Sequence, residues 1–256
     1  MTQGPVTILP VPGVPMVEPG DDLPSLITDA LAAADLALQD GDVIVVAQKI
    51  ISKAEGCYVN LNEIEPSAEA IEIGARVNKD PEFVEAVLRE SVDVVRTAPE
   101  VLIVEHHSGI VMANAGIDRS NIERGADDGM ALLLPKDANA SATRLRDDLV
   151  QQSGVTIAVV IADSVGRAWR YGTTALAIGC AGIEPLHDQR GGVDMFDHVL
   201  EVTEVALVDQ IAAAANMVMG EATEAVPVAV VRGYDYPASE RPTSVLIRAK
   251  NEDLFR

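Results

Sequence analysis

Cysteine is scarce in this sequence of 256 residues, which contains only Cys57 and Cys180. Two isolated cysteines do not make a disulfide framework, and their spacing does not match a zinc site. We therefore expect two small thiols that are buried or half-buried in the fold. Aromatic residues are also rare, at 3% of the chain. The hydrophobic core must consequently consist mainly of Val, Ile, Leu and Ala side chains.

Positive charge is in short supply as well. The chain has 19 Lys and Arg residues against 40 Asp and Glu residues, which gives a formal net charge of -21. Nucleic acids and anionic membranes bind proteins through broad basic surfaces, which this composition does not provide. We expect neither as a partner, whereas a small anionic ligand held by a few local cations is compatible with this charge.

Long apolar runs are missing too. No run reaches the length of about 18 residues that a membrane-spanning helix needs. The first 20 residues lack a basic segment followed by a continuous apolar stretch, so they do not look like a secretory signal. A cytoplasmic protein is the resulting expectation.

The common catalytic signatures are also absent. The sequence contains no GxxxxGK[ST] loop, no GxGxxG fingerprint and no HExxH helix. Ser164 lies in Ala-Asp-Ser-Val-Gly, which lacks the first glycine of a nucleophile elbow. Any active site must therefore be assembled from residues that are scattered along the chain.

The residues that are present predict a folded α+β protein. The apolar fraction is 48%, and no linker or repeat divides the chain, so we treat residues 1–256 as one catalytic unit. Predicted strands and helices do not alternate strictly, which favours mixed, largely antiparallel sheets with packed helices over a parallel doubly wound sheet. The predicted helices include 23–38, 141–152 and 203–219, and the predicted strands include 6–11, 42–47, 92–95, 101–104, 110–113, 156–161, 226–231 and 244–247.

Two acidic residues follow apolar segments and suggest a metal site. Asp118 comes after MANAGI, and Asp163 comes after TIAVVIA and directly precedes Ser164. Carboxylate and hydroxyl oxygens suit Mg²⁺ or Mn²⁺, and strand ends are frequent positions for active-site residues. The structural alternative is that Asp118 closes a turn and that Asp163 caps a helix. Spacing alone does not decide between these interpretations.

The few cations gather in two places. Lys49 and Lys53 follow the predicted strand 42–47, where they could hold an anion. Arg167 and Arg170 lie beside Trp169 in GRAWRYG, and forked guanidinium donors suit a phosphate or a carboxylate. We interpret these two arginines as contacts for an anionic substrate; a solvated loop anchored by Trp169 is the alternative.

Five blocks of sequence together resemble one known family. They are GDVIVVAQKIISKAEG (41–56), NAGIDRSN (114–121), IADSVGRAWRYG (161–172), AIGCAGI (177–183) and VPVAVVRG (226–233). In this order they are similar to the coenzyme F-420-0:L-glutamate ligases, the F-420 gamma-glutamyl ligase family. The likeness is to the actinobacterial form, here without the C-terminal nitroreductase-like domain that often follows it.

The resemblance implies a GTP-dependent enzyme that forms an amide between L-glutamate and the carboxylate of a deazaflavin phosphodiester. It also implies a γ-linked glutamate tail in some members, two divalent ions (Mg²⁺ or Mn²⁺), stimulation by K⁺, and an intertwined homodimer. Carried onto this sequence, the metal ligands are Asp118, Asp163, Ser164 and Glu221. The implied nucleotide contacts are Val14, Pro15, Met16, Val17, Gln48, Lys49, Lys53, Asn121, Met217, Met219, Gly220 and Glu221.

Two other functions stay open on the sequence. One is a metal-dependent GTP-using ligase for another acceptor, or a GTP phosphohydrolase. The other is a deazaflavin-binding protein without catalysis. The intact Asp118, Asn121, Asp163 and Ser164 argue against the second alternative, because a protein that loses catalysis usually loses its metal ligands first.

Overall fold

The computed structural model describes residues 4–122 and 129–253. Its main element is a five-stranded sheet with the strand order β1-β12-β2-β8-β9. These strands are β1 (Thr7–Pro10), β2 (Val43–Ala47), β8 (Ala158–Arg167), β9 (Arg170–Ala181) and β12 (Val228–Arg232). Only β2 and β8 pair in parallel, and every other pair in this sheet is antiparallel. The predicted α+β class with largely antiparallel sheets is therefore confirmed.

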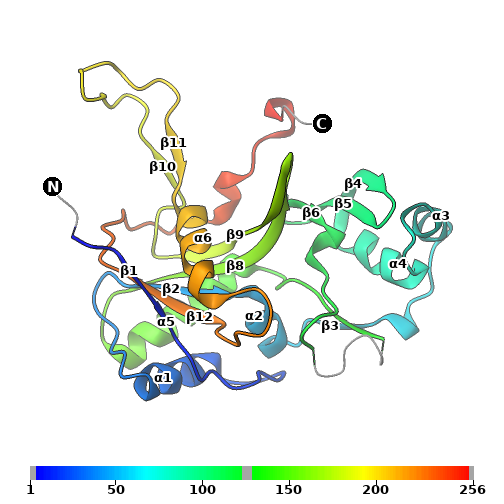
Figure 1. Ribbon diagram of the computed structural model, residues 1–256, viewed down its shortest axis with the longest axis horizontal. Helices are drawn as coiled ribbons and strands as arrows, with labels where there is room; N and C mark the ends of the chain where they lie inside the picture. The colour runs from blue at the N-terminus through cyan, green and yellow to red at the C-terminus, as the bar shows by residue number, and fades with distance from the viewer. Residues whose placement is uncertain (1–3, 123–128, 254–256) are drawn as a thin grey trace.

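Helices cover both faces of this sheet (Figure 1). The helices α1 (Leu23–Ala33) and α5 (Ala138–Ser153) pack on one face, and α6 (Leu207–Met219) packs on the other. Alternate residues of β2 therefore enter two different cores: Ile44 lies among α1 and α5, whereas Val45 faces α6. Burial on both faces explains why this strand is continuously apolar in the sequence.

A smaller lobe lies beside the sheet (Figure 1). It consists of a three-stranded antiparallel sheet, β4 (Ser91–Ala98), β5 (Val101–His106) and β6 (Val111–Ala113), which confirms the three strands predicted there. The helices α3 (Ala68–Val77) and α4 (Pro81–Arg89) pack on it around Phe83, Val84 and Leu102. The remaining short elements are α2 (Gln48–Ala54), β3 (Tyr58–Asn60), β7 (Met130–Leu132), β10 (Leu186–Asp188) and β11 (Glu204–Ala206).

Several predicted helix boundaries are wrong, each for a local reason. The first helix ends at Ala33 rather than at 38, because Asp35 adopts a left-handed conformation with φ of 56°. The helix predicted over 141–152 begins earlier, at Ala138, since the Asp137 side chain accepts a hydrogen bond from the Ala140 amide. The helix predicted from 203 begins at Leu207, because residues 204–206 pair with β10 as a strand.

Two strand predictions also need correction. Residues 243–246 form a 3₁₀ turn and not the predicted strand. The strand predicted over 156–161 continues to Arg167, so Asp163 lies within β8 and not at its end. Asp118 does not follow a strand directly either, because a left-handed turn at Asn114, Ala115 and Gly116 separates it from β6. The sequence between Asn114 and Leu134 is polar and contains glycine, which is typical of a loop, and its residues 123–128 lie outside the described residues.

Among residues 4–122 and 129–253, no helix has both the length and the apolar character that a membrane crossing requires.

Candidate functional site

A cavity of about 800 Å³ opens where the parallel pairing of β2 and β8 stops. The last paired residues are Ala47 and Ala162, and the next residues, Gln48 and Asp163, both line the cavity. Helix α2 begins at Gln48, whereas β8 continues as half of a long hairpin with β9. The two chain segments therefore diverge at this point, and the carboxyl ends of the parallel strands open toward the cavity.

Most of the residues singled out in the sequence meet in this one cavity. Its lining includes Met16, Gln48, Lys49, Lys53, Asp118, Asn121, Asp163, Ser164, Met219, Gly220 and Glu221. These residues come from the N-terminal loop, from α2, from the segment after the left-handed turn, from β8 and from the end of α6. The fold thus brings together five blocks that are up to about 200 positions apart in the sequence.

Lys49 is held between two parts of the cavity wall. Its ammonium nitrogen lies 2.6 Å from Asp118 Oδ2 and 3.2 Å from both the carbonyl oxygen and the hydroxyl of Ser120. The Asp118 carboxylate also accepts hydrogen bonds from the amide and the hydroxyl of Ser120. Burial opposes ionisation of Asp118, but these donors outweigh it and lower the pKa of this carboxyl below its ordinary value. Asp118 is therefore an anion at neutral pH.

Asp163 lies in a different electrostatic environment. Burial raises the pKa of its carboxyl to about 6, and the negative charges of Asp118 and Glu221 add to the shift, while the Ser164 amide and Lys49 oppose it. A buried carboxylate beside two other carboxylates is costly unless a cation compensates it. This surplus of negative charge, at the floor of a cavity that opens to solvent, is typical of a functional site and not of a packed core.

Glu221 closes the opposite wall. Its Oε1 atom accepts hydrogen bonds from the Ser164 hydroxyl at 2.8 Å and from Asn216 Nδ2 at 2.6 Å. Gly220, which precedes it, ends α6 with φ of 77°, a conformation that glycine adopts without strain. The glycine thereby turns the chain so that Glu221 reaches back across the sheet to β8.

Lys53 lies at the back of the cavity and is buried. Its ammonium nitrogen donates a hydrogen bond to the Asn121 carbonyl oxygen at 2.8 Å. Asn121 itself has a left-handed backbone, with φ of 54°. Lys49 and Lys53 lie one helical turn apart on α2 and thus join this helix to the segment 118–121. The lining of the cavity thus contains the two lysines, Lys49 and Lys53, together with the carboxylates of Asp118 and Asp163.

Several sequence-predicted residues do not line this cavity. Arg167 and Arg170 lie at the tip of the β8–β9 hairpin, where Arg167 donates a hydrogen bond to the Tyr171 carbonyl oxygen. Trp169 forms the hairpin turn with φ of 58° and is 78% exposed. The remaining predicted residues outside the lining are Val14, Pro15, Val17 and Met217. The two arginines therefore do not reach this cavity within the described chain.

The sequence also gave no indication of several lining residues. Asn216 is one turn before the end of α6 and orients Glu221, and Ser120 supports both Lys49 and Asp118. The Ser120 position could have been found from the NAGIDRSN block, whereas Asn216 looks like an ordinary polar residue on a helix. Thr173 and Ala175 enter from β9, which was not among the predicted strands.

The donor set agrees in kind with Mg²⁺ or Mn²⁺. These ions prefer oxygen ligands and often take one or two carboxylates, with water and phosphate oxygens completing the shell. Asp118, Asp163, Ser164 and Glu221 all supply oxygen atoms. Within the described ranges, no group of three or more His, Cys, Asp or Glu side chains is arranged to hold an ion by itself. A metal at this position would therefore depend on oxygen atoms of a bound ligand.

Comparison with known proteins identifies the family of this chain. Residues 13–233 match the model of the F420-0:Gamma-glutamyl ligase family. A protein of Methanothermobacter thermautotrophicus named coenzyme F420:L-glutamate ligase is 42% identical over 253 residues, which is 98% of this chain and 99% of that protein. Proteins of the same name from Methanopyrus kandleri and Methanocaldococcus jannaschii are each 41% identical, over 97% and 87% of this chain and 97% and 88% of their own lengths.

Proposed function

Because the chain belongs to the F420-0:gamma-glutamyl ligase family, we propose that it joins L-glutamate to the free carboxylate of a deazaflavin phosphodiester, with GTP as the energy source. The observation that carries the proposal is the meeting of Lys49, Asp118, Asp163 and Ser164 in one cavity of about 800 Å³. Two ammonium groups, a hydroxyl and several carboxylates suit a polyphosphate that brings its own divalent cations. The volume also accommodates a nucleotide-sized ligand.

The reaction needs an activated carboxylate, because a carboxylate anion is a poor electrophile. In our proposal the γ-phosphoryl group of GTP moves to a carboxylate oxygen of the coenzyme, and GDP leaves. The glutamate amine then attacks the carbonyl carbon of the acyl phosphate, the carbon–oxygen bond to phosphate breaks, and the amine loses a proton. Charge develops on phosphoryl oxygens in both steps, so the site must stabilise negative charge.

The residues divide this work by their charge. Lys53 is buried and lies one turn from Lys49, so the two ammonium groups would face successive phosphates of the nucleotide. Gln48 and Asn121 also line the cavity, and in the proposal they would donate hydrogen bonds to the same ligand. Met16 and Met219 supply an apolar wall, against which the purine base would pack. The remaining predicted nucleotide contacts, Val14, Pro15, Val17 and Met217, stay predictions.

Asp118, Asp163, Ser164 and Glu221 are the proposed ligands of Mg²⁺ or Mn²⁺. When bound, such an ion supplies positive charge that screens the phosphoryl oxygens and orients them. Two contacts support these proposed roles. Lys49 holds Asp118 in its ionised form, and the Ser164 hydroxyl is oriented by Glu221. Stimulation by K⁺ and extension of a γ-linked tail are further parts of the proposal.

A mass assay tests this function. The protein is incubated with the deazaflavin phosphodiester, GTP, Mn²⁺ and L-glutamate, and the coenzyme is analysed by mass spectrometry. We expect a gain of one or more glutamyl groups that requires both GTP and the divalent ion. GTP cleavage that continues equally well without coenzyme and glutamate would instead support a phosphohydrolase. Substitution of Na⁺ for K⁺ in the same assay tests the monovalent ion.

We also propose that the protein is a homodimer. The strands β10 and β11 form an arm that projects from the body (Figure 1). Its end carries exposed apolar side chains, which are Val193, Met195, Phe196, Val199 and Val202. An apolar surface of this kind is typical of a protein interface. Replacing Phe196 with Asp should convert a dimer to a monomer in light scattering, whereas a monomeric parent protein would refute the proposal.

A further inference from the structure

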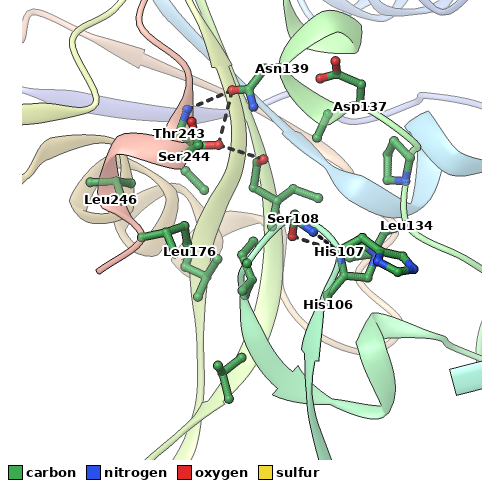
Figure 2. Close-up of a pocket in the computed structure, with 18 of the residues that line it drawn as sticks. His106, His107, Ser108, Leu134, Asp137, Asn139, Leu176, Thr243, Ser244 and Leu246 are labelled. Carbon is green, nitrogen blue, oxygen red and sulfur yellow. Dashed lines mark hydrogen bonds between the residues drawn. The ribbon is translucent and has the colours of Figure 1, made fainter. Parts of the chain in front are cut away.

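A second cavity, of about 620 Å³, lies farther along β9 than the site described above (Figure 2). The first cavity is lined by Thr173 and Ala175 of this strand, and the second is lined by the three residues that follow, 176–178. The other walls come from the loop after β5, the start of α5, the start of α6 and the 3₁₀ turn at 243–246. Its apolar part includes Ile110, Leu134, Leu176, Ile178 and Leu246.

Side chains cap the open edge of β9 at this cavity. Among the described strands β9 is at the edge of its sheet, so its outward groups have no neighbouring strand. Asp209 accepts a hydrogen bond from the Ala177 amide at 2.9 Å, and Asn139 accepts one from the Cys180 amide at 3.2 Å. The Thr243 hydroxyl donates to the Ile178 carbonyl oxygen at 3.0 Å. These contacts leave one hydrogen-bonding atom of Asn139 and one of Asp209 without a partner in the described chain.

One polar atom of Asn139 is left over. Its Oδ1 atom accepts hydrogen bonds from the backbone amides of Cys180 and Thr243, which fixes the orientation of the side-chain amide. The nitrogen Nδ2 therefore points away from Thr243 (Figure 2). Within the part of the chain that the structure describes, it has no hydrogen-bond partner and lines the cavity. It is a donor without an acceptor.

Asp209 has the complementary arrangement. One carboxylate oxygen is used by Ala177, and the other has no partner among residues 4–122 and 129–253. The side chain is half-buried at the cavity wall, and burial raises its pKa above the ordinary value. A carboxylate oxygen in this setting calls for a positively charged donor. The part of the cavity next to Asp209 thus favours the binding of an ammonium group.

Cations lie at the rim of the same cavity. Lys136 and Arg248 are exposed and line it from opposite segments of the chain. Ala138 and Asn139, the first two residues of α5, also line the cavity. Their backbone amides are not capped by Asp137, because its side chain accepts from the Ala140 amide. Guanidinium, ammonium and free amide groups suit carboxylates. Three aspartates line the cavity, Asp137, Asp209 and Asp253; Asp137 caps α5 through the Ala140 amide, and Asp209 keeps one oxygen free for an ammonium group. The cavity therefore offers an acceptor for an ammonium group at Asp209 and several donors for carboxylates.

We infer that this cavity binds the α-amino acid that the enzyme joins to its coenzyme, with Asp209 holding the ammonium group and Asn139, Lys136 and Arg248 facing the carboxylates. The inference rests on the proposed function, in which this substrate is L-glutamate. Helix α6 connects the two sites: Asp209 lies in its first turn, and Asn216, which lines the first cavity, lies two turns later. At 1.5 Å per residue this separation is about 10 Å along the axis.

The test uses the full chain and the variant Asp209→Asn. The amide oxygen of asparagine still accepts the Ala177 hydrogen bond, so the cap on β9 is kept while the negative charge is lost. We expect the KM for L-glutamate to rise at least about tenfold, the cost of one charge-assisted hydrogen bond, while the KM for GTP changes less than about twofold. Asp148→Asn, an exposed residue of α5 outside the cavity, is the matched control.

A binding measurement separates recognition from structure. Equilibrium dialysis with labelled L-glutamate, in the presence and absence of GDP and Mn²⁺, is repeated with glutarate, which lacks the ammonium group, as competitor. The parent protein should prefer glutamate, and Asp209→Asn should lose the preference. Substitution of Lys136 and Arg248 by Gln should lower the affinity for both L-glutamate and glutarate. An unchanged preference, or a loss of coenzyme affinity with an unchanged KM for glutamate, would overturn the assignment.

The two proposals fail in different ways. Glutamate binding that depends on Asp209 in a protein that makes no glutamylated product would refute the ligase and keep the amino-acid site. Product formation with a normal KM for glutamate in Asp209→Asn would keep the ligase and refute the site.

Discussion

The ammonium nitrogen of Lys49 lies 2.6 Å from Oδ2 of Asp118, across 69 positions of sequence. The two side chains are 26% and 38% exposed, so the pair lies at the cavity surface and not in the core. Their contact attaches α2, which follows the central strand β2, to the segment that leaves the smaller lobe. It thereby fixes the relative position of a candidate phosphate ligand and a candidate metal ligand.

Replacing Lys49 with Met should affect both the ionisation of Asp118 and the binding of GTP. The pKa of Asp118 should rise, because hydrogen bonds and charge from Lys49 are among the causes that keep it low. The affinity for GTP should fall by at least about tenfold, as expected for a lost charge-assisted contact. Equilibrium binding of a fluorescent GTP analogue measures this loss. Lys79→Met, on the surface of the smaller lobe, should leave the affinity unchanged.

Replacing Asp163 with Asn should abolish turnover and stabilise the metal-free protein. The pKa of Asp163 is about 6 in the folded protein, against an ordinary value of 3.8 for an aspartate in an unfolded chain. The folded state therefore loses stability relative to the unfolded state as the pH rises from 3.8 to 6. Above pH 6 the cost is about 2–3 kcal/mol. In EDTA at pH 7.5 the variant should be more stable by this amount.

Urea unfolding of both proteins across pH 3.5 to 7.5 checks this prediction. The difference between them should become small near pH 3.5, where the carboxyl of Asp163 is mostly protonated in both states. Equal stability of the variant and the parent at pH 7.5 would contradict the burial argument.

His106 should make the protein sensitive to acid. Burial, with a smaller effect from His107, lowers the pKa of His106 to about 4 from an ordinary value of 6.5. A depressed pKa contributes stability above pH 6.5 and loses it as the pH falls toward 4. The loss should be about 2 kcal/mol, since one side of the ring faces the second cavity. His106→Gln should flatten this part of the stability profile, and His187→Gln should not.

Arg232 should be essential for stability. It forms two hydrogen bonds with Asp42, of 2.8 and 2.7 Å, and Asp42 is only 1% exposed. Arg232→Met leaves a buried carboxylate without its partner, which should cost about 3–5 kcal/mol in urea unfolding. The exposed pair of Arg76 and Glu72 is the comparison: Arg76→Met should cost about 0.5 kcal/mol or less.

Gly179→Ala should destabilise the protein, because an added Cβ atom would lie 2.3 Å from the Ala138 carbonyl oxygen. Something in the contact between β9 and α5 must then move. Gly166→Ala is the control on the neighbouring strand, since a Cβ atom there meets nothing within 4 Å. A similar thermal shift for both variants would show that close packing at Gly179 is not the cause.

Sequence patterns predicted the buried strands well and the site only in outline. The β2 strand was evident because it is apolar on both faces. The predicted end of α5 at residue 152 lies one residue before the observed end at Ser153, which the left-handed Gly154 follows. The length of β8 was not evident, because Asp163 and Ser164 interrupt the apolar run that marks a buried strand. Asp163 and Ser164 can lie within β8 because β2 has already ended beside them. This depends on how the two strands pair and cannot be read from the sequence of either strand alone.

The positions of the arginines show the same limit. Charge and composition made Arg167 and Arg170 candidates for the substrate, but hairpin pairing carries them away from the cavity. Conversely, Asp209 and Asn139 have no local pattern that distinguishes them. Their significance comes from contacts with the edge of β9, which join residues 32 and 41 positions apart.

The capped edge of β9 also limits how sheets from two molecules could merge. An open edge strand can recruit another chain and start aggregation. At Ala177, Ile178 and Cys180 the outward backbone groups are already bonded to side chains, so no second strand can add there. Any continuous sheet between two copies must therefore use a different stretch of backbone, such as the Arg170–Ala175 half of the strand. Asp209, Asn139 and Thr243, which line the second cavity, thus also prevent edge-to-edge polymerisation through this part of β9.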